Sequence, residues 1–136
     1  MKKQLNPLTN SKRIGDFGEK IARHYLEKKK YKILAQNFKN KWGEIDIIAK
    51  KKDEITFFEI KTLHSPKISQ EKTFFPEDKI SLKKKNQLRK MAQIYLSERK
   101  IPLDFPYQID VLSVEISSDF KKAKIRHFRN IVEDSY

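Results

Sequence analysis

Apolar residues recur at two different periods along the chain, and the change of period separates predicted helices from predicted strands. Over residues 14–29 they return at every third or fourth position, which is typical of a helix with one buried face. These positions are Ile14, Phe17, Ile21, Ala22, Tyr25 and Leu26. A second helix is predicted over residues 81–98, where Leu88, Met91, Ala92 and Tyr95 share a face. Asn10 or Ser11 is suited to cap the first helix.

Shorter apolar or alternating segments predict five strands. They cover residues 31–38, 44–49, 55–62, 107–116 and 124–128. Pro66 and Pro76 lie in a segment, 64–78, that predicts a long loop. The order of elements predicts an α/β fold with a mixed central β-sheet flanked by helices. We expect a flexible N-terminal arm over residues 1–12 and a single domain over residues 13–136, since the length suits one domain.

Composition narrows the chemistry that is available. The chain has no cysteine, which excludes disulfides, thiolate metal sites and a cysteine nucleophile. Its three histidines are not at the spacing of helical metal ligands. No apolar run is long enough for a membrane span or a signal sequence, so we expect a cytoplasmic protein with no membrane partner.

Positive charge is the strongest feature of the composition. Lysine and arginine number 31 against 18 acidic residues, a formal net charge of +13. In so short a chain this charge favours phosphate polyanions, so nucleic acid is the leading class of partner. The alternative is that the lysines serve only solubility.

The second predicted strand carries two acidic residues where an apolar strand is expected. Alternation of side chains places Glu44 and Asp46 on one face, opposite Ile45 and Ile47. Alternation therefore predicts two neighbouring carboxylates on one side of the strand.

The third predicted strand carries an acid and a base at the end of an apolar row. Glu59 and Lys61 share a face with Ile55 and Phe57. If the second and third strands form a hairpin, Asp46 converges with Glu59 and Lys61 at one end of the sheet.

Such a cluster suits metal-dependent hydrolysis of a phosphodiester. Carboxylate oxygens hold Mg²⁺ or Mn²⁺, which neutralises charge in the transition state and acidifies a bound water. A lysine can orient or deprotonate that water, or stabilise charge. The alternative is the solvated face of an amphipathic hairpin, with a cross-strand pair worth roughly 0.2–1 kcal/mol.

Three residues outside this cluster have two interpretations each. Glu19 lies at the edge of the first helix's apolar face, where it either reaches the sheet or pairs with Arg23 one turn away. Lys84 begins the inward face of the second helix, or belongs to a solvated run of lysines. Trp42 either stacks on a base or packs into the fold.

With these positions assembled, the chain resembles the bacterial YraN-like family, whose members are assigned as endonucleases by similarity. That family is similar to archaeal Holliday-junction resolvases and shares the restriction-endonuclease-like core. The matching stretches are residues 15–19 (GDFGE) with Ala22, Tyr25 and Leu26, Asn37, residues 43–49 (GEIDIIA), residues 57–62 (FFEIKT), Lys84 with Leu88 and Ala92, and residues 109–111 (IDV). The combination of the second and third blocks is specific, and the resemblance covers nearly the whole chain after residue 13.

The resemblance implies a role for each matched residue. Asp46 and Glu59 would be metal ligands, with the Ile60 carbonyl as a third. Lys61 would be the catalytic lysine, and Glu19 the helix acid that completes the site. Two positions depart from the family, which usually has arginine where this chain has Leu63 and Gln108. Both departures remove a cation suited to phosphate.

Three functions follow as hypotheses. The first is a Mg²⁺- or Mn²⁺-dependent endonuclease acting on DNA, including branched DNA, with lysines at 28–30, 50–52 (Lys50, Lys51, Lys52) and 83–85 (Lys83, Lys84, Lys85) lining its channel. A symmetric cut in a four-way junction would need a two-fold homodimer. The second is a non-catalytic nucleic-acid-binding protein that retains the fold. The third is a basic adaptor for an acidic protein.

Overall fold

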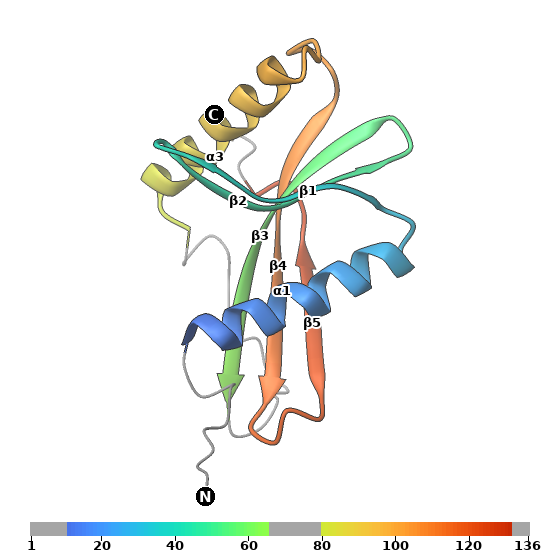
Figure 1. The fold of residues 1–136 in the computed structure, drawn as a ribbon, viewed down its shortest axis with the longest axis vertical. Helices are drawn as coiled ribbons and strands as arrows, with labels where there is room; N and C mark the ends of the chain where they lie inside the picture. Colours follow the sequence, from blue (N-terminus) through green and yellow to red (C-terminus); the bar gives the residue numbers. More distant parts are fainter. Residues whose placement is uncertain (1–10, 66–79, 132–136) are drawn as a thin grey trace, which may run out of the picture.

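The computed structural model describes residues 11–65 and 80–131, which form one sheet with a helix on either face (Figure 1). The elements are α1 (Ser11–Lys28), β1 (Lys32–Asn40), β2 (Gly43–Lys51), β3 (Glu54–Ser65), α3 (Leu82–Glu98), β4 (Tyr107–Ser117) and β5 (Ala123–Phe128). The strands lie in the order β1-β2-β3-β4-β5, with β3 and β4 parallel and the other neighbours antiparallel. The predicted α/β class with a mixed sheet is therefore confirmed.

Each helix buries its apolar face against one side of the sheet. Ala22 and Leu26 of α1 pack in one cluster with Phe58 and Ile60 of β3. The apolar residues of α3 pack on the other side, in a cluster that includes Phe57 of β3. Because Phe57 and Phe58 are successive strand residues, they point to opposite faces, and each face has its own core.

The boundaries predicted from the sequence hold with a few corrections. The first helix begins at Ser11 rather than residue 14, so residues 11–12 are helical and are not part of an arm. Strand β3 continues to Ser65, so the first two residues of the predicted loop are strand, because they pair with β4. Residues 66–78 of that loop and residues 1–10 of the arm lie outside the described residues. Ser81 caps α3, accepting the Lys84 N–H through its hydroxyl.

Within the described ranges, neither helix is both long and apolar enough to cross a membrane.

The sheet divides where β2 leaves β3. These strands pair from their connecting turn as far as Ile47 and Phe58. Beyond that pair β3 continues beside β4, whereas the β1–β2 hairpin turns toward α3 (Figure 1). We call this place the fork. Among the described residues, no strand pairs with this edge of β3 from Glu59 onward, and the candidate residues of the sequence lie there.

Candidate active site

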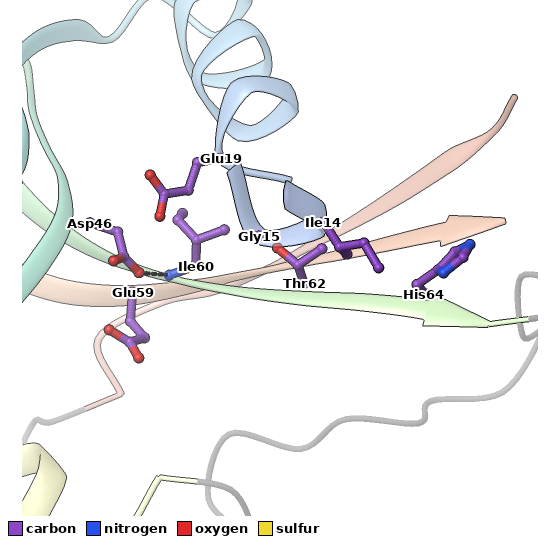
Figure 2. A pocket seen from close by; sticks show the side chains of 8 residues that line it. All are labelled: Ile14, Gly15, Glu19, Asp46, Glu59, Ile60, Thr62 and His64. Carbon is purple, nitrogen blue, oxygen red and sulfur yellow. Dashed lines mark hydrogen bonds between the residues drawn. The ribbon is translucent and has the colours of Figure 1, made fainter. Parts of the chain in front are cut away.

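A pocket of about 480 Å³ lies at the fork, between the N-terminal part of α1 and the edge of β3 (Figure 2). It is lined by Ile14, Gly15, Glu19, Asp46, Glu59, Ile60, Thr62 and His64. The structure thus brings together three carboxylates from three separate elements, α1, β2 and β3.

Asp46 is fixed by the backbone of the neighbouring strand. It directly precedes Ile47, where the pairing of β2 with β3 begins, and its Oδ2 accepts the Ile60 N–H at 2.8 Å. Burial, and then the nearby charge of Glu59, raise the pKa of Asp46 to about 7. The protein therefore holds this carboxyl in a place where its negative charge is unfavourable without a cation.

Glu59 lies between two ammonium groups. It is 8% exposed, and its Oε2 lies 3.8 Å from both Lys61 Nζ and Lys84 Nζ. Burial raises the pKa of Glu59, while Lys84 and then Lys61 oppose that rise. The common face predicted for Glu59 and Lys61 agrees with this contact, and α3 contributes a second lysine to the same carboxylate.

Glu19 approaches the pocket from α1, on the side of β3 opposite Glu59 (Figure 2). The alternative partner Arg23 donates instead to Glu27, at 3.2 Å, and to Gln36 of β1. Burial, and then the charge of Glu44, raise the pKa of Glu19. The structure therefore favours the interpretation in which Glu19 reaches the sheet.

Asn37 links two of the carboxylates, a role that the residue pattern alone did not assign. With its amide nitrogen turned toward the acids, Asn37 lies 3.2 Å from both Glu44 Oε2 and Glu19 Oε1. Its φ of 52° is in the left-handed region, which asparagine tolerates better than most residues. The signal in the sequence was that Asn37 is among the positions matching the family, which gave no role for it.

A glycine allows α1 to lie close enough to β3 for Glu19 to face the pocket. A Cβ atom at Gly18 would lie 2.0 Å from Thr62 Oγ1. Any larger residue would push the helix and the strand apart. Gly18 therefore sets the position of its neighbour Glu19.

The donor atoms at the fork suit a hard divalent cation. Asp46 and Glu59 supply carboxylate oxygens, and the Ile60 carbonyl is directed to the same edge as its N–H, which Asp46 accepts. In the part of the chain that the structure describes, no three acidic or histidine side chains are grouped closely enough to hold an ion by themselves. Mg²⁺ commonly takes one or two carboxylates and completes its shell with water and substrate phosphate, so the residues present fit this ion.

The predicted lysine runs lie in different places. Residues 83–85 are at the start of α3, beside Glu59, which Lys84 contacts. Residues 50–52 are at the β2–β3 turn, at the far end of β2 from Asp46. There Lys50 lies 5.8 Å from the Phe105 ring and Lys51 lies 5.1 Å from the Tyr31 ring.

Leu63 and Gln108, the two residues that depart from the family pattern, both have contacts within the fold. Leu63 packs with Ile80 and Val111 in a small apolar cluster. Gln108 donates to the fully buried Asp110 at 2.9 Å.

Asp110 holds the C-terminal part of the described chain in place. It accepts the Asn130 N–H at 2.8 Å and lies 2.7 Å from His127 Nε2. Its hydrogen bonds give this acid a structural role.

Comparison with known proteins identifies the relatives of this chain. Residues 18–114 match the model of a family described as "Uncharacterised protein family UPF0102". A UPF0102 protein of Caldanaerobacter subterraneus subsp. tengcongensis is 37% identical over 122 residues, covering 89% of this chain and 95% of that protein. A UPF0102 protein of Alkaliphilus oremlandii is 38% identical over 121 residues, covering 88% and 97%. A UPF0102 protein of Clostridium botulinum strain Loch Maree is 36% identical over 120 residues, covering 88% and 94%.

The family match spans more than half of the chain, and the relatives align over nearly all of their own length. The chain therefore belongs to the UPF0102 family, the YraN-like family that its sequence motifs resemble.

Proposed function

We propose that this protein is a Mg²⁺- or Mn²⁺-dependent endonuclease that hydrolyses phosphodiester bonds in DNA. The observation that carries the proposal is the fork, where Asp46 and Glu59 lie beside Lys61 and Lys84 at the edge of β3 beyond its pairing with β2. Two carboxylates with two ammonium groups match the charges of a metal ion and a phosphodiester. The net charge of +13 supplies the attraction for the DNA backbone.

Each residue of the fork has a separate task in this proposal. A bound divalent ion would neutralise charge on the scissile phosphate and lower the pKa of an attacking water. Asp46 and Glu59 would hold it, with Asp46 oriented by the Ile60 N–H. Lys61 would orient the attacking water or take its proton, while the charge of Lys84 would oppose the rise in the pKa of Glu59. Glu19, from the opposite side of β3, would complete the acidic set.

A second function, a nucleic-acid-binding protein without catalysis, is favoured by one observation. Among the described residues the fork holds no complete set of three acidic or histidine ligands. Such a protein would bind DNA without a divalent ion, with affinity falling steeply as salt rises. Its affinity would survive substitution of the carboxylates.

Cleavage assays separate the two functions. A labelled four-way junction and its matched linear duplex are incubated with Mg²⁺, with Mn²⁺ or with a chelator. We expect cleavage only with the ion, and a loss of at least 100-fold in Asp46→Asn, Glu59→Gln and Lys61→Met. Asp53→Asn, in the exposed β2–β3 turn, is the matched control and should keep full activity.

Two results would count against the nuclease. The first is a wild-type protein that binds both DNAs and cuts neither. The second is cleavage that the three substitutions leave unchanged, since the activity would then come from a contaminant.

A further inference from the structure

The tryptophan of this chain lies in the turn between β1 and β2, with 46% of its surface exposed. In residues 11–65 and 80–131, three large hydrophobic residues have exposed side chains: Trp42, Leu82 and Leu103. Trp42 is the aromatic one of the three. Burial of so large a ring is normally favourable. Its exposure therefore needs an explanation other than packing.

The backbone around Trp42 is held in place. The Trp42 N–H donates to Asn40 Oδ1 at 2.7 Å, and Gln87 Nε2 of α3 donates to the Trp42 carbonyl at 2.8 Å. Gly43 has a φ of 155°, and a Cβ atom there would lie 2.8 Å from Gln87 Cδ. The turn is thus attached to α3, and the ring is presented from a fixed backbone.

Two ammonium groups accompany the exposed ring. Lys90 Nζ of α3 lies 3.5 Å from the ring centroid, and Lys41 Nζ lies 5.2 Å from it. A lysine above an exposed aromatic ring contributes less interaction free energy than a nucleobase stacked on the same ring does. A base can therefore replace the ammonium group on the ring, and the lysine is then free to pair with a neighbouring phosphate.

The ring is joined to the candidate active site through two elements. Gln87, which holds the turn, is one helical turn from Lys84, which contacts Glu59. Trp42, directly before β2, precedes Asp46 by four residues, or about 13 Å in an extended strand. A DNA strand with a phosphate at the fork has a neighbouring base within reach of Trp42.

We propose that Trp42, flanked by Lys41 and Lys90, is a stacking platform for an unpaired base of the DNA strand bound at the fork. A base inside a continuous duplex has both faces covered by its neighbours, so it offers no face to the ring. The platform thus selects DNA with unpaired bases, such as a bulge, a flap or a single-stranded arm. This inference rests on the proposed function for the position of the strand.

The emission of Trp42 reports stacking directly, because it is the one tryptophan in the sequence. The full chain carrying Asp46→Asn, which prevents cleavage, is titrated with three DNAs: a perfect duplex, the same duplex with a one-base bulge, and a single strand. We expect the bulged and single-stranded DNAs to quench the emission and to protect it from acrylamide. The perfect duplex should bind with little change in emission.

Affinity measurements on substituted chains give the second readout. Trp42→Ala should weaken binding of the bulged DNA by about 5- to 100-fold and of the perfect duplex by less than 2-fold. Trp42→Phe keeps a stacking ring and should recover most of the loss. Leu103→Ala, which removes an exposed apolar side chain elsewhere, should change neither affinity. Circular dichroism checks that each variant is folded.

Several outcomes would overturn the platform. One is bulged DNA that saturates the protein without changing the emission of Trp42. Another is a Trp42→Ala chain that loses affinity equally for all three DNAs. A third is a Trp42→Phe chain that binds bulged DNA as weakly as Trp42→Ala does. Cleavage by the wild type without a stacking signal would contradict the stacking platform alone. Stacking without cleavage would contradict the nuclease alone, and a chain that binds none of the three DNAs would contradict both proposals.

Discussion

At the scale of single residues, the fork places acidic groups where their charge is unfavourable. Asp46 has its pKa raised to about 7, and the pKa values of Glu19 and Glu59 are also raised, with burial the largest cause in each case. Raised carboxyl pKa values that depend on each other are frequent at functional sites. A divalent cation relieves the repulsion between carboxylates that adds to the effect of burial on these pKa values.

The raised pKa of Asp46 predicts how stability depends on pH. Between pH 3.8 and about 7 the Asp46 carboxyl is protonated in the native state but ionised in the unfolded chain. The contribution of Asp46 to the free energy of unfolding therefore falls as pH rises through that range. Asp46→Asn stays neutral and can still accept the Ile60 N–H. We expect it to exceed the wild type in free energy of unfolding by about 2–4 kcal/mol at pH 8, with the difference vanishing near pH 4.

Urea denaturation of both chains at pH 4, 6 and 8, without divalent ions, measures this difference. A gap that stays constant across the three pH values would show that Asp46 keeps an ordinary pKa. Adding Mg²⁺ at pH 8 should stabilise the wild type and leave Asp46→Asn unchanged.

Lys84 allows a comparison within one lysine run. Lys84→Gln removes a cation 3.8 Å from Glu59 and should lower the cleavage rate by about 10-fold or more. Lys83→Gln removes an exposed neighbour and should leave the rate at saturating DNA within about 2-fold of the wild type. Single-turnover cleavage rates of the two variants give this comparison. Equal losses of rate in both variants would mean that Lys84 contributes to DNA binding only and not to the action of Glu59.

Sequence reasoning located the main residues of the fork but not all of their contacts. Strand alternation predicted that Glu59 and Lys61 share a face, because that rule is local. The contact of Lys84 with Glu59 joins residues 25 positions apart and depends on how α3 crosses the sheet. No periodicity within either element contains that information.

At the scale of elements, the close contact of α1 with β3 decides where Glu19 lies. Gly18→Ala would force its methyl group against Thr62, at a calculated 2.0 Å from Oγ1, and should destabilise the fold by about 1–3 kcal/mol. Gly15→Ala meets no atom within 4 Å and should stabilise α1 by about 0.5–1 kcal/mol. Denaturant titration of both variants tests the pair, and a Gly18→Ala chain as stable as Gly15→Ala would contradict the packing described here.

The helices and strands were predictable within a few residues, whereas the twist of β2 was not. Alternation predicted Ile45 and Ile47 on a common face, but Ile45 packs on the α3 side of the sheet and Ile47 on the α1 side. The strand changes the side of the sheet to which its odd-numbered residues point at Asp46, where β2 leaves β3. Strict alternation assumes a strand that stays in one sheet, and the fork breaks this assumption.

At the scale of the whole molecule, two of the lysine runs that contribute to the net charge of +13 lie at different places relative to the fork. The lysines at 83–85 lie beside it, whereas Lys50 and Lys51 lie against aromatic rings at the far end of β2. Each phosphate contact contributes about 0.9 to the slope of log affinity against log salt concentration.

Replacing all three lysines at 83–85 with glutamine should therefore lower that slope by about 2–3. The same change at 50–52 should lower it by less than about 1. Anisotropy titrations between 50 and 200 mM salt provide the slopes. Equal slopes in the two triple variants would mean that DNA covers both ends of β2.

The edge of β3 that no described strand pairs with also bears on self-association of this protein. An unpaired strand edge offers its backbone groups to any other extended chain and so promotes aggregation. Here a side-chain carboxylate occupies the Ile60 N–H, and α1 lies against Thr62. Asp46→Ala removes that acceptor and Asp46→Asn keeps one, so light scattering during refolding should rise in the alanine variant alone. We therefore expect the acid that we propose as a metal ligand also to protect the newly folded chain from self-association.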